Sequence, residues 1–254
     1  MEIVTACPGR LLDHIYRRTI NLQDVSILVL DEADRLFDMG FMPDVHRIIT
    51  FLPAKRQTLL FSATMSVDIH QLVADILDHP VTIEVAANAP TPTVSHVLFP
   101  VKESRKADLL IEILYREQKL TRSVLIFART KRRARKVADW LKSYGHNVTL
   151  LEGDMTQFRR TKAIQGFREG SYQLMVATDI AARGIDVADI SHVINYDVPD
   201  NTEAYIHRIG RTGRIYESGV AYTLATPRDG IVVKALENML KGKLERRTLS
   251  GFKY

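Results

Sequence analysis

Short apolar runs alternate with amphipathic segments along most of the chain, and this alternation restricts the fold more than any other feature of the sequence. After residue 95, the pattern predicts strands at about 96–101, 124–127, 148–151, 174–177, 193–196 and 221–224. Amphipathic helices are predicted near 106–118, 131–144, 157–169, 202–209 and 229–240. Regular alternation of strand and helix predicts a mostly parallel sheet that is covered on both faces, so we expect an α/β fold.

The first 85 residues have the same character over a shorter length. Buried strands are predicted at 25–30, 58–61 and 81–85, with helices around 42–51 and 67–77. This piece resembles the back end of an α/β domain rather than a whole one. Residues 86–95 carry no charge and include two prolines, which is typical of a semi-extended linker. We therefore predict a partial first domain at 1–85, a linker at 86–95, a second domain at 96–243 and a short tail at 244–254.

Charge is distributed unevenly between these two parts. Residues 1–95 contain 7 Lys plus Arg and 12 Asp plus Glu, whereas residues 96–254 contain 28 and 18. The net charges are −5 and +10, which together give the +5 of the whole chain. A basic second part favours a polyanionic partner, although solvated cations on helix surfaces produce the same imbalance.

Cysteine content and apolar run length indicate the compartment. The single cysteine, Cys7, cannot form an intrachain disulfide or a thiolate zinc site, which favours a reducing environment. The longest apolar runs, such as residues 27–30, are the length of a strand and well short of the ~20 residues that a membrane span needs. We expect a soluble, cytoplasmic protein with no membrane partner.

Two adjacent carboxylates follow the apolar strand at 25–30. In nucleotide hydrolases, a buried strand that ends in acidic residues holds Mg²⁺ and positions the attacking water. By this interpretation Asp31 binds Mg²⁺ and Glu32 orients or deprotonates the water. The simpler interpretation is that this acidic pair caps the next helix. Ser62 and Thr64 follow the next strand, where their hydroxyls could bond the acidic cluster.

Arginines near the end of the second domain suit a phosphate ligand. Residues 207–214 place Arg208, Arg211 and Arg214 three residues apart, among glycines that allow close backbone approach. Because guanidinium groups are always charged and fork-shaped, Arg211 and Arg214 are suited to the γ-phosphate of a nucleotide. Exposed arginines in a glycine-rich loop are the alternative.

Seven segments in this order make the chain resemble the DEAD-box RNA helicases of superfamily 2. They are Pro8 to Arg10, Asp31 to Asp34, Ser62 to Thr64, Leu125 to Lys131, the pair Gln157 and Arg160, Ala177 to Asp186, and His207 to Arg214. The short tail further resembles bacterial members of the family. The resemblance implies two RecA-like lobes that bind ATP and Mg²⁺ between them and single-stranded RNA across their top.

Roles implied by the resemblance attach to particular positions. ATP binding and catalysis involve Asp31, Glu32, Gly184, Asp186, Arg211 and Arg214, with Asp186 at the ribose. Coupling of nucleotide state to lobe closure involves Asp34, Ser62, Thr64 and His207. RNA binding, mainly to the phosphate backbone, involves Pro8, Gly9, Arg10, Arg129, Thr130, Lys131, Gln157, Arg160 and Thr178.

A physical feature independent of the resemblance also favours RNA. Residues 131–136 include five cations, Lys131, Arg132, Arg133, Arg135 and Lys136, in the first turns of a predicted helix. The helix dipole disfavours cations there by a few tenths of a kcal/mol each, a cost that a bound polyanion relieves. A solvated basic face is the alternative.

The sequence departs from the family in two respects. No G-x-x-x-x-G-K-[ST] loop and no adenine-reading aromatic and Gln element occurs in the 254 residues, so only part of the nucleotide site is present. Cys7 occupies a position where the family usually has Thr, and a thiol is the weaker hydrogen-bonding group.

Three functions are compatible with these features. The first is an ATP-dependent RNA helicase that unwinds short duplexes, represented by an N-terminally truncated chain. The second is a non-catalytic module that binds RNA or a protein partner through an intact second lobe. The third, a DNA helicase of the same superfamily, matches the motifs less well. In any of them, we expect residues 1–85 to be marginally stable in isolation and 96–254 to fold independently.

Overall fold

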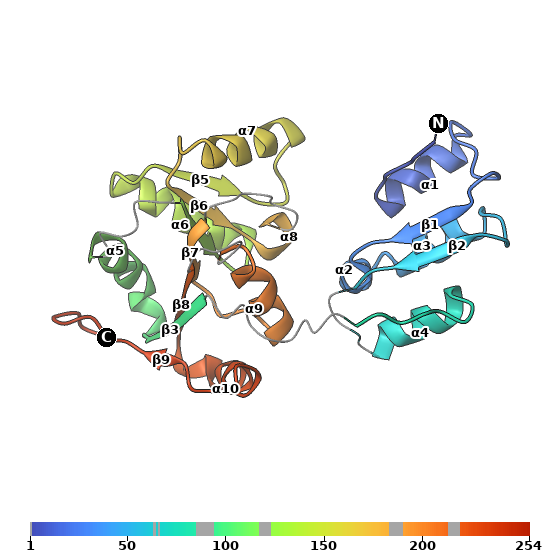
Figure 1. The fold of residues 1–254 in the computed structure, drawn as a ribbon. Helices are drawn as coiled ribbons and strands as arrows, with labels where there is room; N and C mark the ends of the chain where they lie inside the picture. The colour runs from blue at the N-terminus through green and yellow to red at the C-terminus, as the bar shows by residue number, and fades with distance from the viewer. Residues whose placement is uncertain are drawn as a thin grey trace. The chain divides into compact units, whose positions relative to one another are not determined.

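The computed structural model describes residues 2–62, 65, 67–84, 94–116, 123–182, 190–212 and 219–254. The chain divides into two compact units, Met1–Ala87 and Asn88–Tyr254, here called unit 1 and unit 2. Figure 1 shows the elements of each unit. Within the described ranges, no helix is both long and apolar enough to cross a membrane.

Unit 2 is built on a seven-stranded sheet in which every pair of neighbouring strands is parallel. Its strands are β3 (Val94–Pro100), β4 (Ser123–Phe127), β5 (Val148–Leu151), β6 (Leu174–Ala177), β7 (Ile190–Asn195), β8 (Gly219–Ala225) and β9 (Glu245–Arg246). They lie in the order β5-β6-β4-β7-β8-β3-β9. The apolar strand residues are buried on both faces, as expected for a parallel sheet.

Helices cover both faces of this sheet. They are α5 (Lys106–Arg116), α6 (Lys131–Ser143), α7 (Gln157–Arg168), α8 (Asp179–Ala182), α9 (Thr202–Ile209) and α10 (Gly230–Met239). Alternate strand residues separate the layers: Val124 and Ile126 of β4 pack with α5 and α6, whereas Leu125 and Phe127 pack with α7 and α8. Helices α9 and α10 form a third apolar cluster with β3 and β8.

Each helix that follows a strand begins at the carboxyl edge of the sheet, where parallel strands end. Thr130, Thr156 and Asn201 fix the starts of α6, α7 and α9, because each side chain accepts a hydrogen bond from a backbone N–H of the first turn. The carboxyl edge therefore collects the first turns of these helices, which is where ligands bind in open α/β sheets.

The described residues of unit 1 form a two-stranded parallel sheet and four helices. The elements are α1 (Pro8–Tyr16), β1 (Ile27–Leu30), α2 (Ala33–Asp38), α3 (Met42–Ile49), β2 (Gln57–Leu60) and α4 (Val67–Ile76). One face of the sheet is apolar but exposed: Ile27, Val29, Leu59 and Phe61 are 53%, 51%, 36% and 55% exposed. Two strands with a bare face bury little apolar surface, so we expect this unit to be the less stable of the two.

Several sequence predictions are corrected by the structure. Residues 81–84 do not form the predicted strand. Val81 and Ile83 are 88% and 83% exposed, so packing against the described residues does not stabilise a strand there. Residue 85, the end of that predicted strand, lies outside the described residues. Pro8 to Arg10 form the first turn of α1, because proline's fixed φ is compatible with the first helical position.

The C-terminal segment is also more structured than the sequence suggested. Strand β9 adds to the edge of the sheet beside β3, and Leu249, Phe252 and Tyr254 pack against the core of unit 2. The Lys102 Nζ donates to the backbone oxygen of Tyr254 over 3.0 Å. The tail is thus part of the folded unit.

Candidate nucleotide and nucleic-acid sites

The acidic cluster of unit 1 lies where β1 ends. Asp31 is exposed, and its Oδ1 accepts a hydrogen bond from the Glu32 N–H over 2.9 Å. Glu32 has a left-handed backbone (φ 49°, ψ 53°) and forms an ion pair with Arg35. Although Glu32 occupies the N-cap position of α2, its side chain makes no capping hydrogen bond. The helix-capping interpretation of the acidic pair therefore lacks its defining contact at Glu32.

Ser62 lies beside this cluster. Its Oγ accepts a hydrogen bond from the Asp34 N–H over 3.3 Å, and the Asp34 side chain is only 9% exposed. The Ala33 N–H donates to the Phe61 carbonyl over 2.9 Å, which ties the end of β2 to the start of α2. The chain beyond β2 thus contacts the acidic cluster through both backbone and hydroxyl. Thr64, the other hydroxyl predicted to act here, lies outside the described residues.

The cluster suits a hard cation with few protein ligands. Among the described residues, no group of three or more His, Cys, Asp or Glu side chains could enclose a metal ion. Mg²⁺ in nucleotide sites takes one or two carboxylates and completes its octahedron with phosphate oxygens and water. The exposed Asp31 carboxylate fits that donor set.

The predicted RNA-contacting residues of unit 1 form the start of α1. Pro8, Gly9 and Arg10 are its first three residues, and Cys7 at the N-cap makes no side-chain capping bond. Arg10 is 73% exposed, with its Nη1 at 3.8 Å from an Asp13 oxygen. The first-turn N–H groups and the Arg10 side chain are thus available on one helix end.

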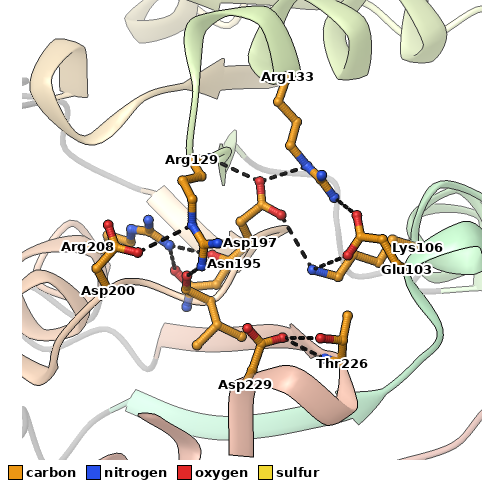
Figure 2. Close-up of polar contacts among 11 residues, drawn as sticks. Glu103, Lys106, Arg129, Arg133, Asn195, Asp197, Asp200, Arg208, Thr226 and Asp229 are labelled. Carbon is orange, nitrogen blue, oxygen red and sulfur yellow. Dashed lines mark hydrogen bonds and ion pairs between the residues drawn. The ribbon is translucent and has the colours of Figure 1, made fainter. Parts of the chain in front are cut away.

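At the carboxyl edge of unit 2, a buried carboxylate organises the basic side chains (Figure 2). Asp197 follows β7 and is 6% exposed at its side chain. Its oxygens lie 3.0 Å from the Arg129 backbone nitrogen, 2.9 Å from Arg133 Nε and 3.4 Å from Lys106 Nζ. Asp197 therefore joins the start of α6, the start of α5 and the end of β7.

Glu103 extends this network toward solvent. It pairs with Arg133 and lies 3.5 Å from Lys106 Nζ. Burial by itself raises the pKa of Glu103, but the hydrogen bond from Arg133 and the charge of Lys106 outweigh it and hold the pKa below its ordinary value. Burial raises the pKa of Tyr196, whose ring lies under Arg133, to about 12. The network is thus charged and fixed at neutral pH.

Arg208 forms a second buried centre at the same edge. Its side chain is 2% exposed and makes two hydrogen bonds to Asp179, of 2.6 and 2.8 Å. Its Nη1 donates to Asn195 Oδ1 over 3.0 Å and to the Asp197 carbonyl over 2.7 Å. The guanidinium therefore holds α9 against α8 and the end of β7.

Two residues with predicted roles lie next to Arg208: His207, predicted for coupling, and Arg211, predicted for nucleotide binding. His207 and Arg211 line a small cavity of about 30 Å³ together with Asp179 and Phe127, which has room for a water molecule or two. Arg211 is the second residue after the end of α9 and is partly exposed. Gly184, Asp186 and Arg214, which were also predicted for this site, lie outside the described residues.

The structure brings the predicted RNA residues of unit 2 to the carboxyl edge. Arg129 and Thr130 precede α6, Lys131 and Gln157 begin α6 and α7, Arg160 lies in the first turn of α7, and Thr178 follows β6. They differ in accessibility. Gln157, Arg129 and Lys131 are exposed, whereas Thr178 is 6% exposed. Thr130 Oγ1 already accepts from the Arg133 N–H over 3.2 Å.

Three of the five cations of α6 already form ion pairs with carboxylates of the protein. Lys131 pairs with Asp154, Arg133 with Glu103 and Asp197, and Arg135 with Glu152 at 2.6 Å and Asp154 at 3.2 Å. The hydrogen bond from Lys131, with the charges of Lys131 and Arg135, holds the pKa of Asp154 below its ordinary value. Protein carboxylates therefore already offset much of the unfavourable dipole interaction.

Two cations of α6 remain available. Arg132 and Lys136 are exposed and form no ion pair with any described residue. Being four residues apart, they share one face of the helix, where like charges repel by a few tenths of a kcal/mol. An anion bound at Arg132 and Lys136 would relieve this repulsion.

Sequence reasoning missed the residues that hold this edge together. Asp197, Lys106, Arg208 and Asp179 were not assigned a role, although all four are buried or half-buried charged groups in close contact. Asp179 and Arg208 each lie inside a recognised motif, at 177–186 and 207–214. Asp179 and Arg208 could therefore have been found by asking which charged residues of these motifs had not been assigned a ligand.

Comparison with known proteins agrees with this arrangement. Residues 1–72 match the model of the DEAD/DEAH box helicases, and residues 105–216 match that of the helicase conserved C-terminal domain. A DEAD-box ATP-dependent RNA helicase CshA of Bacillus subtilis is 41% identical over 246 residues, covering 96% of this chain and 49% of the relative. The chain spans about half the length of the curated relatives it matches.

Solved structures show the same fold. Dbp5 of S. cerevisiae, bound to RNA and ADP BeF3, superposes with a TM-score of 0.84 at 34% identity, covering 94% of this chain and 64% of that one. The E. coli DEAD-box protein SrmB, bound to regulator of ribonuclease activity A, is 34% identical with a TM-score of 0.58, covering 61% of this chain and 91% of that one. The fold is that of RecA-like ligand-binding lobes, which confirms the α/β prediction. The chain belongs to the DEAD-box family of RNA helicases.

Proposed function

We propose that this chain acts in ATP-dependent remodelling of RNA, coupling ATP hydrolysis to the local unwinding of short duplexes. The observation that carries the proposal is the carboxyl edge of unit 2, where a buried ionic network positions exposed cations and helix first turns toward one surface. Such a surface suits a phosphate backbone and gives no basis for reading bases in a duplex. Family membership and an RNA-bound structural neighbour support the same conclusion.

In the nucleotide site, Asp31 holds Mg²⁺ and Glu32 orients the attacking water. Arg211 and Arg214 stabilise the charge that develops on the γ-phosphate, while Gly184 and Asp186 contact the nucleotide, with Asp186 at the ribose. The oxygen donors near β1 and the exposed position of Asp31 support the assignment of Mg²⁺.

Coupling and RNA binding use neighbouring residues. Asp34, Ser62, Thr64 and His207 transmit the nucleotide state, and the hydrogen bond between Asp34 and Ser62 supports this role. RNA phosphates contact the helix starts that contain Pro8, Gly9 and Arg10, then Arg129, Thr130 and Lys131, then Gln157 and Arg160, with Thr178 nearby. Since Cys7 is the chain's one cysteine, we also propose a cytoplasmic, reducing location.

A second candidate is RNA binding without catalysis. The cations proposed to bind RNA lie mostly on unit 2, whereas Asp31 and Glu32 lie on unit 1. Unit 2 could therefore bind RNA whether or not the protein hydrolyses ATP.

The experiment that separates the two is ATPase activity of the full chain with and without single-stranded RNA. Helicase function predicts RNA-stimulated hydrolysis that falls by about 10³-fold in Arg211→Ala. The matched control is Lys142→Ala in the last turn of α6, far along the helix from the edge, which should keep wild-type activity. RNA binding without any RNA-stimulated ATPase would favour the second candidate, and absence of RNA binding would exclude both.

A further inference from the structure

Phe158 is an aromatic side chain that is largely exposed on the surface of unit 2. It is the second residue of α7 and is 78% exposed. In the described part of the chain, no other ring and no cation contacts its ring. The buried residues of α7 are Ala163 and Phe167. Phe167 lies nine residues, or about two and a half helical turns, after Phe158, so the two side chains are on opposite sides of the helix. Phe158 therefore points directly away from the core.

The surroundings of Phe158 are basic. Helix α7 contains Arg159, Arg160, Lys162 and Arg168 and no acidic residue. Arg159 and Lys162 are exposed and form no ion pair with described residues. Lys162 is four positions after Phe158, so the ring and the ammonium group share one helix face. An exposed ring flanked by unpaired cations is the combination that sequence-tolerant single-strand binders use.

The location of α7 joins this surface to the predicted RNA edge. The helix follows β5, so its first turn lies at the carboxyl edge of the sheet, as does the first turn of α6 (Figure 1). Asp154, in the connection from β5 to α7, forms ion pairs with both Lys131 and Arg135 of α6. The two helix starts are therefore held close together, and one strand could contact both.

We propose that Phe158 is a stacking platform for an unpaired base of the bound RNA strand. Arg159 and Lys162 hold the flanking phosphates while the ring receives the base face. This inference rests on the proposed RNA binding and adds a contact to the bases of a strand that is otherwise held by its backbone. Stacking is tolerant of sequence, because every base has a π-face, so the platform adds affinity without selecting a particular base.

The test measures the affinity of the full chain for a fluorescein-labelled single-stranded oligouridylate and for an abasic strand with the same number of phosphates. Phe158→Ala should weaken binding of the oligouridylate by about 5- to 140-fold, which corresponds to the loss of one stacked base. Phe158→Leu, which keeps apolar area but not the aromatic face, should also weaken it, and Phe158→Trp should preserve it. Binding of the abasic strand should be the same in all variants.

Tyr115→Ala is the matched control. Tyr115 is 82% exposed near the end of α5, the end of the helix that is distant from the carboxyl edge, and its loss should leave RNA affinity unchanged. A strand containing 2-aminopurine gives a direct signature, since stacking on Phe158 should quench its fluorescence in the wild type but not in Phe158→Ala.

The outcomes distinguish this inference from the proposed function. If the wild type binds oligouridylate and Phe158→Ala binds it equally well, the stacking platform is wrong while RNA binding stands. Equal weakening of the base-bearing and abasic strands would show that Phe158 supports the fold or contacts something other than a base. If the wild type binds neither strand, the proposed function itself fails.

Discussion

Removal of the Asp197 carboxylate should destabilise unit 2 more than any exposed charge does. Asp197 and Lys106 have side chains only 6% and 3% exposed, so Asp197→Ala leaves a buried ammonium and the Arg129 N–H without this acceptor. Breaking a buried ion pair costs about 3–5 kcal/mol. Because Glu103 remains 3.5 Å from Lys106 and is 57% exposed, we expect the lower end of that range, about 3 kcal/mol.

The chain offers a selective probe for this measurement. Trp140 on α6 is the single tryptophan, so its fluorescence during urea denaturation reports on unit 2 alone. With a dependence of about 2 kcal/mol per molar urea, the midpoint should fall by about 1.5 M. Asp139→Ala, which removes an exposed partner of Lys142 on the same helix, should cost less than about 1 kcal/mol.

A double-mutant cycle separates the ion pair from a general loss of packing. Lys106→Met alone should cost less than Asp197→Ala, because Asp197 keeps Arg133 and the Arg129 N–H. In the double variant no buried cation is left unpaired, so its cost should be at least about 1 kcal/mol below the sum of the two single costs. Additive costs, or a cost for Asp197→Ala no larger than that for Asp139→Ala, would refute the reasoning.

Three further predictions concern stability. Burial lowers the pKa of His96, so the unfolded chain takes up a proton at higher pH than the folded chain does. The stabilisation of the folded state by neutral His96 is therefore present above about pH 6.5 and is lost as the pH falls through the folded pKa. The urea midpoint should therefore decrease when the pH is lowered from 7.5 to 5.0, and this decrease should be smaller in His96→Gln. An equal decrease in the two proteins would contradict the prediction. Arg208→Lys should lower the unfolding free energy by about 3 kcal/mol, because an ammonium cannot reproduce the paired bonds to Asp179, and a midpoint within error of wild type would contradict this. Limited proteolysis should leave a stable fragment spanning 96–254 rather than one from the N-terminal side, because the sheet of unit 1 has a bare apolar face.

Most of the fold of unit 2 could be predicted from local sequence pattern. The predicted strands at 148–151 and 174–177 and the predicted helix at 202–209 agree with β5, β6 and α9 at both ends, because buried β-branched runs and capped amphipathic segments are local signals. The pattern failed where burial depends on a distant partner. Residues 81–84 have strand-like composition but remain exposed, and β9 is a strand only because β3 offers its edge.

The sequence could predict which segments meet at the candidate site, because parallel strands bring their carboxyl ends to one edge of the sheet. It could not predict how the charges of the site are balanced. Arg133 is neutralised by Asp197 and Glu103, which lie 64 and 30 residues away in sequence, and no local pattern reveals that pairing. Sequence therefore identified five cations on α6, and the structure reduces the available ones to Arg132 and Lys136.

The measurement that tests the central claim most directly is the salt dependence of single-stranded RNA binding by the full chain. The claim is that unpaired cations at the carboxyl edge of unit 2, Arg132 and Lys136 on α6 and Arg159 and Lys162 on α7, bind phosphates. Log affinity should fall linearly with log salt, with a slope of about −3 from these four contacts alone and a steeper one with the proposed contacts of Arg129, Lys131 and Arg160. The double variant Arg132→Gln, Arg159→Gln should reduce the slope by about 1.4. A slope near zero, or one that this variant leaves unchanged, would contradict the account.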